Sequence, residues 1–144
     1  MEINCLKLPP LFVQAILSGQ LKRAAGSWQL KTPLDFYGNR LETEIGNVFD
    51  DEKTIFIETE RLLEHFVVDG CYGDDSYEQE PGFIPDVTDF SRVVHFGVSG
   101  DGSPFCFDFR ENEEEPSVIW WDDVYWRKLA PSFQAFLDLF QIDE

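Results

Sequence analysis

The strongest pattern of apolar and polar positions lies in the last third of the chain. A β-branched and aromatic run over 93–98 precedes a cluster of turn residues at 99–103, and residues 104–110 then alternate in character. Strict alternation is typical of a half-buried strand, so the two segments predict a β-hairpin. One side of its second strand carries Phe105, Phe107 and Phe109, and the other carries Cys106, Asp108 and Arg110.

A second hairpin and a helix are predicted to follow. Segments 117–121 and 124–129 are strand-like and flank a turn at 122–123. Apolar residues then recur at the i, i+3, i+4, i+7 spacing of an amphipathic helix over 131–140, and Pro131 suits its first turn. The residues that this helix is expected to place in the core are Phe133, Phe136, Leu137 and Phe140.

The earlier part of the chain shows weaker patterns. A Leu-Pro-Pro start predicts a helix over 9–18. Candidate strands at 43–49 and 54–57 lie on either side of an acidic turn, and a second helix is predicted over 59–68 with Thr59 as its N-cap. The first helix is expected to place Leu11, Ala15 and Ser18 along one side.

Length and composition indicate how these elements assemble. A chain of 144 residues has the size of one domain, and its 43% hydrophobic content, with 14 Phe and 4 Trp, supports a packed core. We therefore expect a single domain over 1–144 of the α+β class. It should contain a single twisted, largely antiparallel sheet of about five to six strands, with the predicted helices packed against it.

Three motifs occur in order along the C-terminal part: Gly-Asp-Gly-x-x-Phe-Cys-Phe-Asp-Phe (100–109), Val-Ile-Trp-Trp-Asp (118–122) and Leu-Ala-x-Ser-Phe-x-x-Phe-Leu (129–137). Their combined order and spacing resembles the SUKH superfamily, which includes fungal cell-wall assembly and glucan-synthesis regulators and many small bacterial immunity proteins. The resemblance implies a non-enzymatic protein-binding module. For bacterial members it implies an immunity protein that binds and neutralises a cognate toxin domain, and the alternative is a regulator or scaffold in cell-wall (glucan) synthesis.

The charge of the chain restricts its partners. There are 28 acidic and 11 basic side chains, for a net charge of −17. Residues 1–40 carry five basic and two acidic side chains (net +3), whereas residues 41–144 carry six basic and 26 acidic ones (net −20). Such a chain would repel nucleic acid and anionic membranes. The charge fits a basic protein partner, such as a basic toxin domain, or a simple need for solubility.

The expected location is the cytoplasm. No apolar run approaches the ~20 residues that a membrane-spanning helix needs, so we expect no membrane partner. The three cysteines are odd in number and far apart in the sequence, which is typical of reduced thiols in a reducing compartment.

An acidic segment over 69–91 is the first candidate for a partner-binding site. It contains no Lys or Arg, and aromatic residues are interleaved with its Asp and Glu residues. Long loops between ordered elements often carry function, although a solvated loop has the same composition. Together with the glutamate run over 111–115, the candidate partner-binding residues are Tyr72, Asp74, Asp75, Tyr77, Glu78, Glu80, Phe83, Glu113, Glu114 and Glu115.

The sequence offers one candidate catalytic pair, Cys106 and His95, which lie on adjacent predicted strands. With Val98 opposite Pro104, His95 would face Phe107, and Cys106 would lie on the other side of the sheet. Only a one-residue slip in register would bring thiol and imidazole together. We therefore expect no catalytic residue, and an enzyme that acts on a small ligand is a third alternative.

Metal and cofactor sites are not indicated. Residues 69–80 have the length of a calcium-binding loop, but Cys71 and Gly73 occupy ligand positions and Asp74 stands where the glycine should be. There is no Cys-x-x-Cys motif and no paired histidine spacing. We therefore expect neither a metal nor a cofactor.

Overall fold

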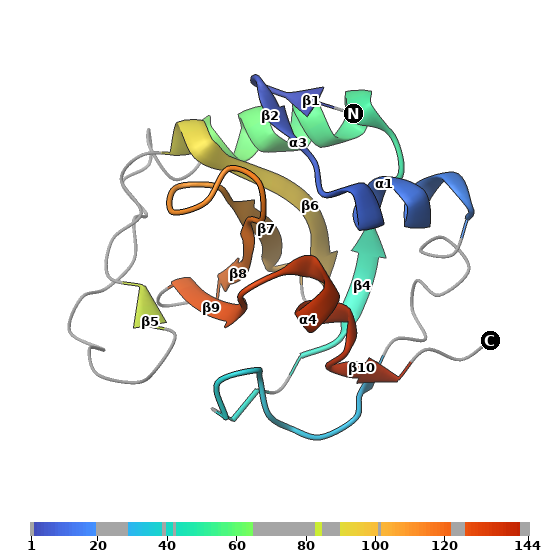
Figure 1. Cartoon of the computed structure of the whole chain (residues 1–144), viewed down its shortest axis with the longest axis vertical. Helices are drawn as coiled ribbons and strands as arrows, with labels where there is room; N and C mark the ends of the chain where they lie inside the picture. The colour runs from blue at the N-terminus through green and yellow to red at the C-terminus, as the bar shows by residue number, and fades with distance from the viewer. Residues whose placement is uncertain are drawn as a thin grey trace.

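One antiparallel sheet of six strands lies at the centre of the computed structural model (Figure 1). Its strands, in spatial order, are β4 (Ile45–Val48), β6 (Val93–Ser99), β7 (Pro104–Asp108), β8 (Ser117–Trp121), β9 (Trp126–Ala130) and β5 (Phe83–Ile84). The four strands from β6 to β9 are sequential neighbours, as the two predicted hairpins require. The α+β class and the five to six antiparallel strands are therefore confirmed.

The remaining elements are short. The structure describes residues 2–19, 29–38, 40–41, 43–64, 83–84, 90–100, 102–121 and 126–141. The helices in these ranges are α1 (Pro10–Leu17), α3 (Glu52–Leu63) and α4 (Phe133–Leu137), with a 3₁₀ turn at Phe90–Arg92. The outer strand pairs are β1 (Glu2–Ile3) with β2 (Leu6–Lys7), and β3 (Gln29–Leu30) with β10 (Phe140–Gln141). Within these ranges, no helix has the length and apolar character needed to cross a membrane.

Strand β7 is buried on both faces, not on one. Its alternation is as predicted: Phe105 and Phe107 join the main hydrophobic cluster beneath α1 and α4, whereas Cys106 joins a smaller cluster with Leu62 of α3 and Trp126 of β9. All five of its residues are buried. The strand is central and has cover on both sides, so alternation here separates two apolar clusters instead of core from solvent.

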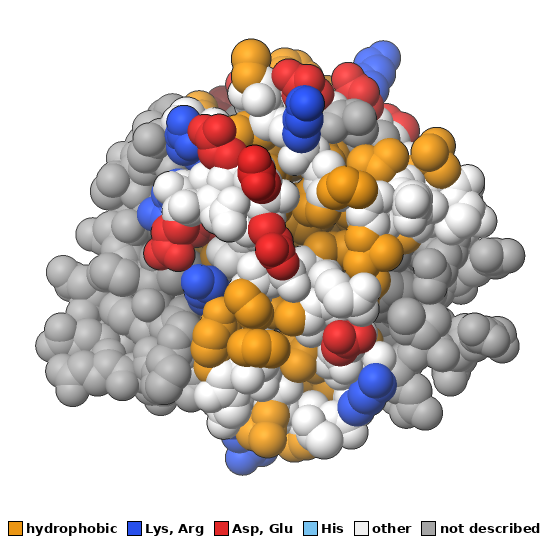
Figure 2. Space-filling model, viewed as in Figure 1, with side chains coloured by type: hydrophobic (Ala, Val, Ile, Leu, Met, Phe, Trp, Pro, Cys, Tyr) orange, Lys and Arg blue, Asp and Glu red, His pale blue; other side chains and the backbone are white. Residues whose placement is uncertain are grey.

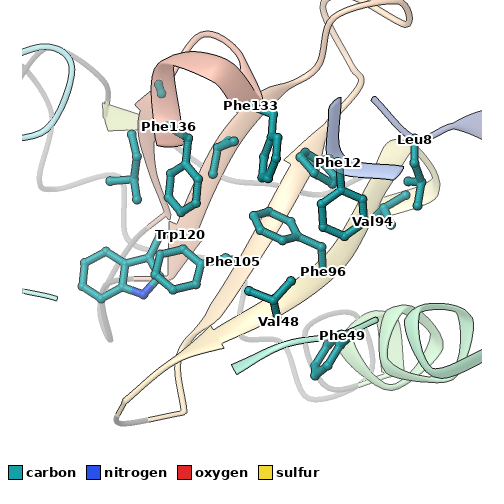
Figure 3. Close-up of a cluster of buried hydrophobic side chains, with 14 of the residues drawn as sticks. Leu8, Phe12, Val48, Phe49, Val94, Phe96, Phe105, Trp120, Phe133 and Phe136 are labelled. Atoms are coloured by element: carbon teal, nitrogen blue, oxygen red, sulfur yellow. The ribbon is translucent and has the colours of Figure 1, made fainter. Parts of the chain in front are cut away.

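The main cluster is built from aromatic rings (Figure 3). Phe96 stacks on Phe107 with 4.2 Å between ring centroids, and Phe12 of α1 meets Phe107 edge-on at 5.1 Å. Phe133 of α4 meets Phe12 edge-on at 5.3 Å. Offset-stacked and edge-on contacts are the favoured geometries for aromatic pairs, so this cluster ties both helices to the sheet.

A β-bulge in β6 changes the predicted register. Val98 pairs with Pro104 as expected and Gly97 pairs with Phe105, but His95 then pairs with Cys106. One extra residue in β6 at this point supplies the slip that the sequence pattern does not reveal. The prediction that His95 faces Phe107 is therefore wrong.

Helix α3 includes residues that the sequence pattern predicted to form a strand. The helix starts at Glu52, because Asp51 is its N-cap and accepts the backbone N–H of Thr54 at 2.7 Å. Residues 54–57 are therefore helical and not a strand, and Thr59 is a buried residue inside the helix instead of an N-cap. The helix is described to its end near Leu63, and residues 65–68 of the predicted 59–68 helix lie outside the described residues. The acidic residues taken for a turn between strands provide the helix start.

The other two helices lie where the sequence predicts them, but their buried residues or their ends differ from the prediction. In α1 the buried residues are Phe12 and Ala15, so the predicted side of the helix is partly wrong. Helix α4 is shorter than the predicted 131–140: Ser132 is its N-cap, and Phe140 belongs to β10 opposite Leu30. Of the residues expected in the core, Phe133, Phe136 and Phe140 are buried, and Leu137 packs partly buried against them.

Candidate protein-binding surface

The acidic loop between β7 and β8, residues 111–115, is held in one conformation by its own side chains. Asn112 Oδ1 accepts the backbone N–H groups of Glu114 at 2.9 Å and Glu115 at 3.1 Å. Glu113 forms an ion pair with Arg92, and all five residues are exposed. The loop therefore presents its four glutamates from a turned backbone instead of from an unstructured run.

The base of this loop is fixed by Asp108. The carboxylate accepts the backbone N–H of Arg110 at 3.0 Å and the guanidinium of the same residue at 2.9 Å through each of its two oxygens. Next to it, the Phe109 N–H donates to the Arg92 carbonyl at 2.8 Å. Asp108 is thus bonded to the backbone and side chain of the turn, consistent with a structural role.

A second loop docks against the edge of β9 through a buried ion pair. The Arg127 guanidinium donates to Asp35 at 3.0 Å and to the Arg40 carbonyl at 3.0 Å, and both side chains of the pair are nearly inaccessible (9% and 0%). The Asp35 carboxylate also accepts the Tyr37 N–H at 2.8 Å. Between them, the Phe36 N–H donates to the Leu129 carbonyl at 3.1 Å. Each of residues 35–37 therefore takes part in a hydrogen bond or an ion pair.

This attached loop exposes apolar side chains. Phe36 is 54% and Leu34 is 42% exposed, and the Phe36 ring meets the Tyr37 ring edge-on at 5.3 Å. We call Leu34, Phe36 and Tyr37 the aromatic ledge. Because the backbone beneath it is anchored, these side chains are offered to solvent at a fixed place, which is a feature of interaction sites.

The aromatic ledge and the acidic loop are neighbours through Lys128. The Lys128 ammonium lies 3.5 Å from the Glu111 carboxylate, and both charges act on the pKa of Tyr37. Burial raises the pKa of Tyr37; Lys128 opposes this shift, and the Asp35 and Glu111 carboxylates add to it. Acidic and hydrophobic side chains are also seen next to each other on the face that carries α4 (Figure 2).

Only part of the predicted partner-binding set lies on this surface. Glu113, Glu114 and Glu115 do. The backbone of Phe83 pairs with Arg127 in the sheet. The other predicted residues lie outside the described residues: Tyr72, Asp74, Asp75, Tyr77, Glu78 and Glu80. The aromatic ledge was missed, because an Asp-Phe-Tyr-Gly turn does not reveal whether its rings are buried; the turn residues themselves were the only available signal.

The structure brings the Cys106 and His95 positions together without activating them. Burial raises the pKa of the Cys106 thiol well above its ordinary value, and the Asp108 charge adds to the shift. A nucleophilic cysteine needs the opposite, a stabilised thiolate. The His95 ring nitrogens lie 2.9 Å from the Gly97 carbonyl and 3.4 Å from the Glu58 carbonyl. In the ranges that the structure describes, no three His, Cys, Asp or Glu side chains are grouped as a metal site.

His95 instead connects α3 to the sheet, and this gives a pH-dependent prediction. Its backbone N–H donates to the Thr59 hydroxyl at 3.0 Å, and burial lowers the pKa of its ring. A lowered folded-state pKa means that the neutral ring stabilises the fold above the unfolded pKa of about 6.5, and that this stability is lost as the pH falls. Urea denaturation at pH 7.5 and 5.0 should show a larger fall in midpoint for the native chain than for His95→Gln. Equal falls would contradict a buried neutral imidazole.

A comparison with protein-family models gives one match. The model of the SMI1 / KNR4 family (SUKH-1) matches residues 6–139, which is nearly the whole chain. The chain belongs to this family. No curated protein and no solved structure matches it in the other two comparisons.

Membership in the SMI1 / KNR4 family confirms the resemblance drawn from the three C-terminal motifs and extends it to the N-terminal part. The matched range runs from β2 to the end of α4, so it includes both the acidic loop and the aromatic ledge. A SUKH-domain protein is thereby established. The family accommodates immunity proteins as well as cell-wall regulators, so the specific role is a matter for proposal.

Proposed function

We propose that the protein is a non-enzymatic immunity protein of the SUKH type, which binds a basic toxin domain and blocks it. The observation that carries the proposal is the acidic loop 111–115, a turned and exposed group of four glutamates in a family member with a net charge of −17. A toxin domain that acts on nucleic acid has a cationic substrate-binding face. An acidic loop of fixed shape is complementary to such a face.

The same charges suggest how the toxin would be blocked. Long-range attraction between an acidic and a basic protein raises the association rate above that of neutral partners. Once bound, the glutamates of the acidic loop would occupy positions that phosphates otherwise take on the toxin. Neutralisation then needs no bond to be made or broken by the immunity protein, only occupancy of the substrate-binding face.

A capture experiment followed by an activity assay tests this proposal. The chain is immobilised, partners are captured from the lysate of its native cell, and the identified partner is purified and assayed for toxicity with and without the chain. Full inhibition at a one-to-one ratio supports the immunity role. Capture of a non-toxic cell-wall synthesis protein, or a toxin whose activity is unchanged, would overturn it and favour the regulator.

The electrostatic part gives a separate prediction. Replacing Glu113, Glu114 and Glu115 with glutamine should slow association with the captured toxin about tenfold at low salt, because three charges at the contact are removed. The matched control removes the same number of charges from the exposed face of α3: Glu52, Glu60 and Glu64.

Stopped-flow measurement of the association rate over a range of salt concentrations checks both variants. The native rate should fall steeply as salt rises, since screening shortens the reach of the field. The loop variant should show a flatter salt response than the α3 control. If the two variants behave alike, the acidic loop has no special place in the encounter.

A further inference from the structure

We propose that the layer formed by α1 and α4 is a docking surface for a second copy of this chain, on a part of the molecule that the proposed toxin contact does not use. We call this layer the uncharged face. Its apolar side chains are exposed to solvent fully or in part. The main ones are Leu11, Val13, Ile16, Leu17, Ala135 and Leu137.

The two helices form one layer over the main aromatic cluster. Phe12 of α1 meets Phe133 of α4 edge-on at 5.3 Å, and both rings are buried. Hydrophobic side chains gather over α1 and between α1 and α4 on the face seen in Figure 2. Leu17, at the end of α1, is 79% exposed, the largest exposed fraction among the large apolar side chains that the structure describes. The apolar side chains left outside therefore belong to one surface.

This surface lacks charge in a chain that is rich in it. Charged residues make up 27% of the sequence, yet none of the 8 residues of α1 and none of the 5 residues of α4 is charged. Helix α3, by contrast, has five charged residues among its 12. The exposed polar side chains of α1 and α4 are the amides of Gln14 and Gln134. Loss of charge with retention of apolar side chains is the composition of the buried centre of protein interfaces.

The net charge of the chain determines which partner this face fits. Two copies that each carry a net charge of −17 repel each other wherever their carboxylates meet. A two-fold contact places the same surface of both copies face to face, so any charge near the axis meets its own equivalent. A face without charges removes this repulsion at short range. A basic partner, in contrast, gains its electrostatic attraction at the acidic surfaces and gains none here.

The edge of the uncharged face carries one charge of each sign. Asp138 ends α4, and Lys31 lies beside it, because the Lys31 N–H donates to the Leu139 carbonyl at 2.9 Å. Both side chains are exposed, and among the residues that the structure describes neither has an ion-pair partner. A two-fold contact can therefore pair Lys31 of each copy with Asp138 of the other, which leaves no unbalanced charge at the edge.

The salt dependence of self-association tests the choice of partner. In analytical ultracentrifugation from about 1 μM to about 500 μM chain, a dimer should form, and its affinity should rise about tenfold between about 50 mM and about 500 mM NaCl. The reason is that salt screens the repulsion between two acidic copies. The toxin complex should respond in the opposite direction. A chain that stays monomeric under all of these conditions, or a dimer that weakens as salt rises, would overturn the proposal.

A carboxylate placed on the uncharged face should disrupt the dimer. Leu17→Glu should weaken dimerisation about tenfold or more at high salt, and circular dichroism should show an intact fold, because Leu17 is 79% exposed. The matched control is Ile57→Glu on α3, where Ile57 is 38% exposed and stands four residues from both Lys53 and Arg61. This variant should dimerise like the native chain. If both substitutions have the same effect on the dimer, the contact does not lie on the uncharged face.

Charge reversal at the edge provides a second, independent measurement. Asp138→Lys and Lys31→Asp each place like charges opposite each other in the two-fold dimer, so each should weaken it about threefold. The double variant restores opposite charges and should regain the native affinity. Losses that add in the double variant would contradict the pairing of Lys31 with Asp138 and with it the proposed docking.

The captured toxin separates this dimer from the immunity role. Leu17→Glu should leave the dissociation rate of the toxin complex unchanged. If the chain is monomeric and Leu17→Glu accelerates toxin dissociation, the uncharged face belongs to the toxin and the second copy is the wrong occupant. If the dimer forms as expected and no toxin is bound, the immunity role fails and the dimer stands.

Discussion

Replacing Phe136 with alanine is expected to lower the free energy of unfolding by about 3–5 kcal/mol. Phe136 is 1% exposed and lies at the centre of the aromatic cluster, 5.0 Å from the Phe140 ring and 5.5 Å from the Phe105 ring. Truncation removes buried apolar surface and leaves a cavity between α4 and the sheet, which rigid neighbouring rings cannot fill. Urea denaturation followed by tryptophan fluorescence measures the loss.

Gln134→Ala on the same helix is the control. Gln134 is exposed, and its side-chain amide donates to the Asp138 carboxylate at 2.9 Å on the helix surface, so its replacement should change stability by less than about 0.5 kcal/mol. Phe136→Leu should fall between the two, since it keeps part of the buried volume. A loss well under 1 kcal/mol for Phe136→Ala would mean that the ring is not buried in solution and that α4 does not pack on the sheet as described.

Replacing Arg127 with alanine is expected to cost about 3–5 kcal/mol of unfolding free energy. The Asp35 side chain is fully inaccessible, and Arg127 is its ion-pair partner at 3.0 Å. Removal of the guanidinium takes away the charge that faces the buried Asp35 carboxylate at 3.0 Å, and it also removes a donor to the Arg40 carbonyl. Thermal and urea denaturation of the variant both report this cost.

Arg61→Ala is the matched control, because Arg61 forms an ion pair with Glu58 at 2.9 Å on the exposed surface of α3. Exposed pairs contribute about 0–1 kcal/mol, so that variant should be nearly as stable as the native chain. A double-mutant cycle with Asp35→Ala then isolates the coupling within the buried pair. The double variant should be more stable than the sum of the two single losses predicts, and strict additivity would show that the two charges do not interact.

The parts of the fold predicted well from sequence are those with strong local patterns. The Phe105, Phe107 and Phe109 alternation predicts strand β7, and the turn-rich sequence at 99–103 predicts its connection to β6. Local patterns of this kind predict the two hairpins, and the spacing of aromatic residues predicts helix α4. Where the local pattern was ambiguous, the prediction failed: Thr54 to Ile57 are β-branched and aromatic residues, yet the Asp51 cap makes them helical.

The candidate site divides in a similar way. The glutamate run over 111–115 is visible in the sequence, because a dense group of like charges next to a proline is exposed in any soluble fold. The exposure of Phe36 is not visible, because aromatic residues are usually buried and nothing in the local pattern marks this one as an exception. The ion pair that anchors this turn joins Asp35 to Arg127, which lies 92 residues further along the chain. No short-range pattern can report a contact at that separation.

The sequence by itself determined the α+β class, the order of the two hairpins, the aromatic composition of the core, the acidic character of the chain and its family. These follow from side-chain periodicity and charge, which are local properties. Only the tertiary structure decided that His95 stands opposite Cys106, that α3 begins at Glu52 behind the Asp51 cap, and that the aromatic ledge lies beside the acidic loop. Each of these depends on contacts between segments far apart in the chain, where a single bulge, a helix cap or a buried ion pair selects among arrangements that local patterns leave equally favourable.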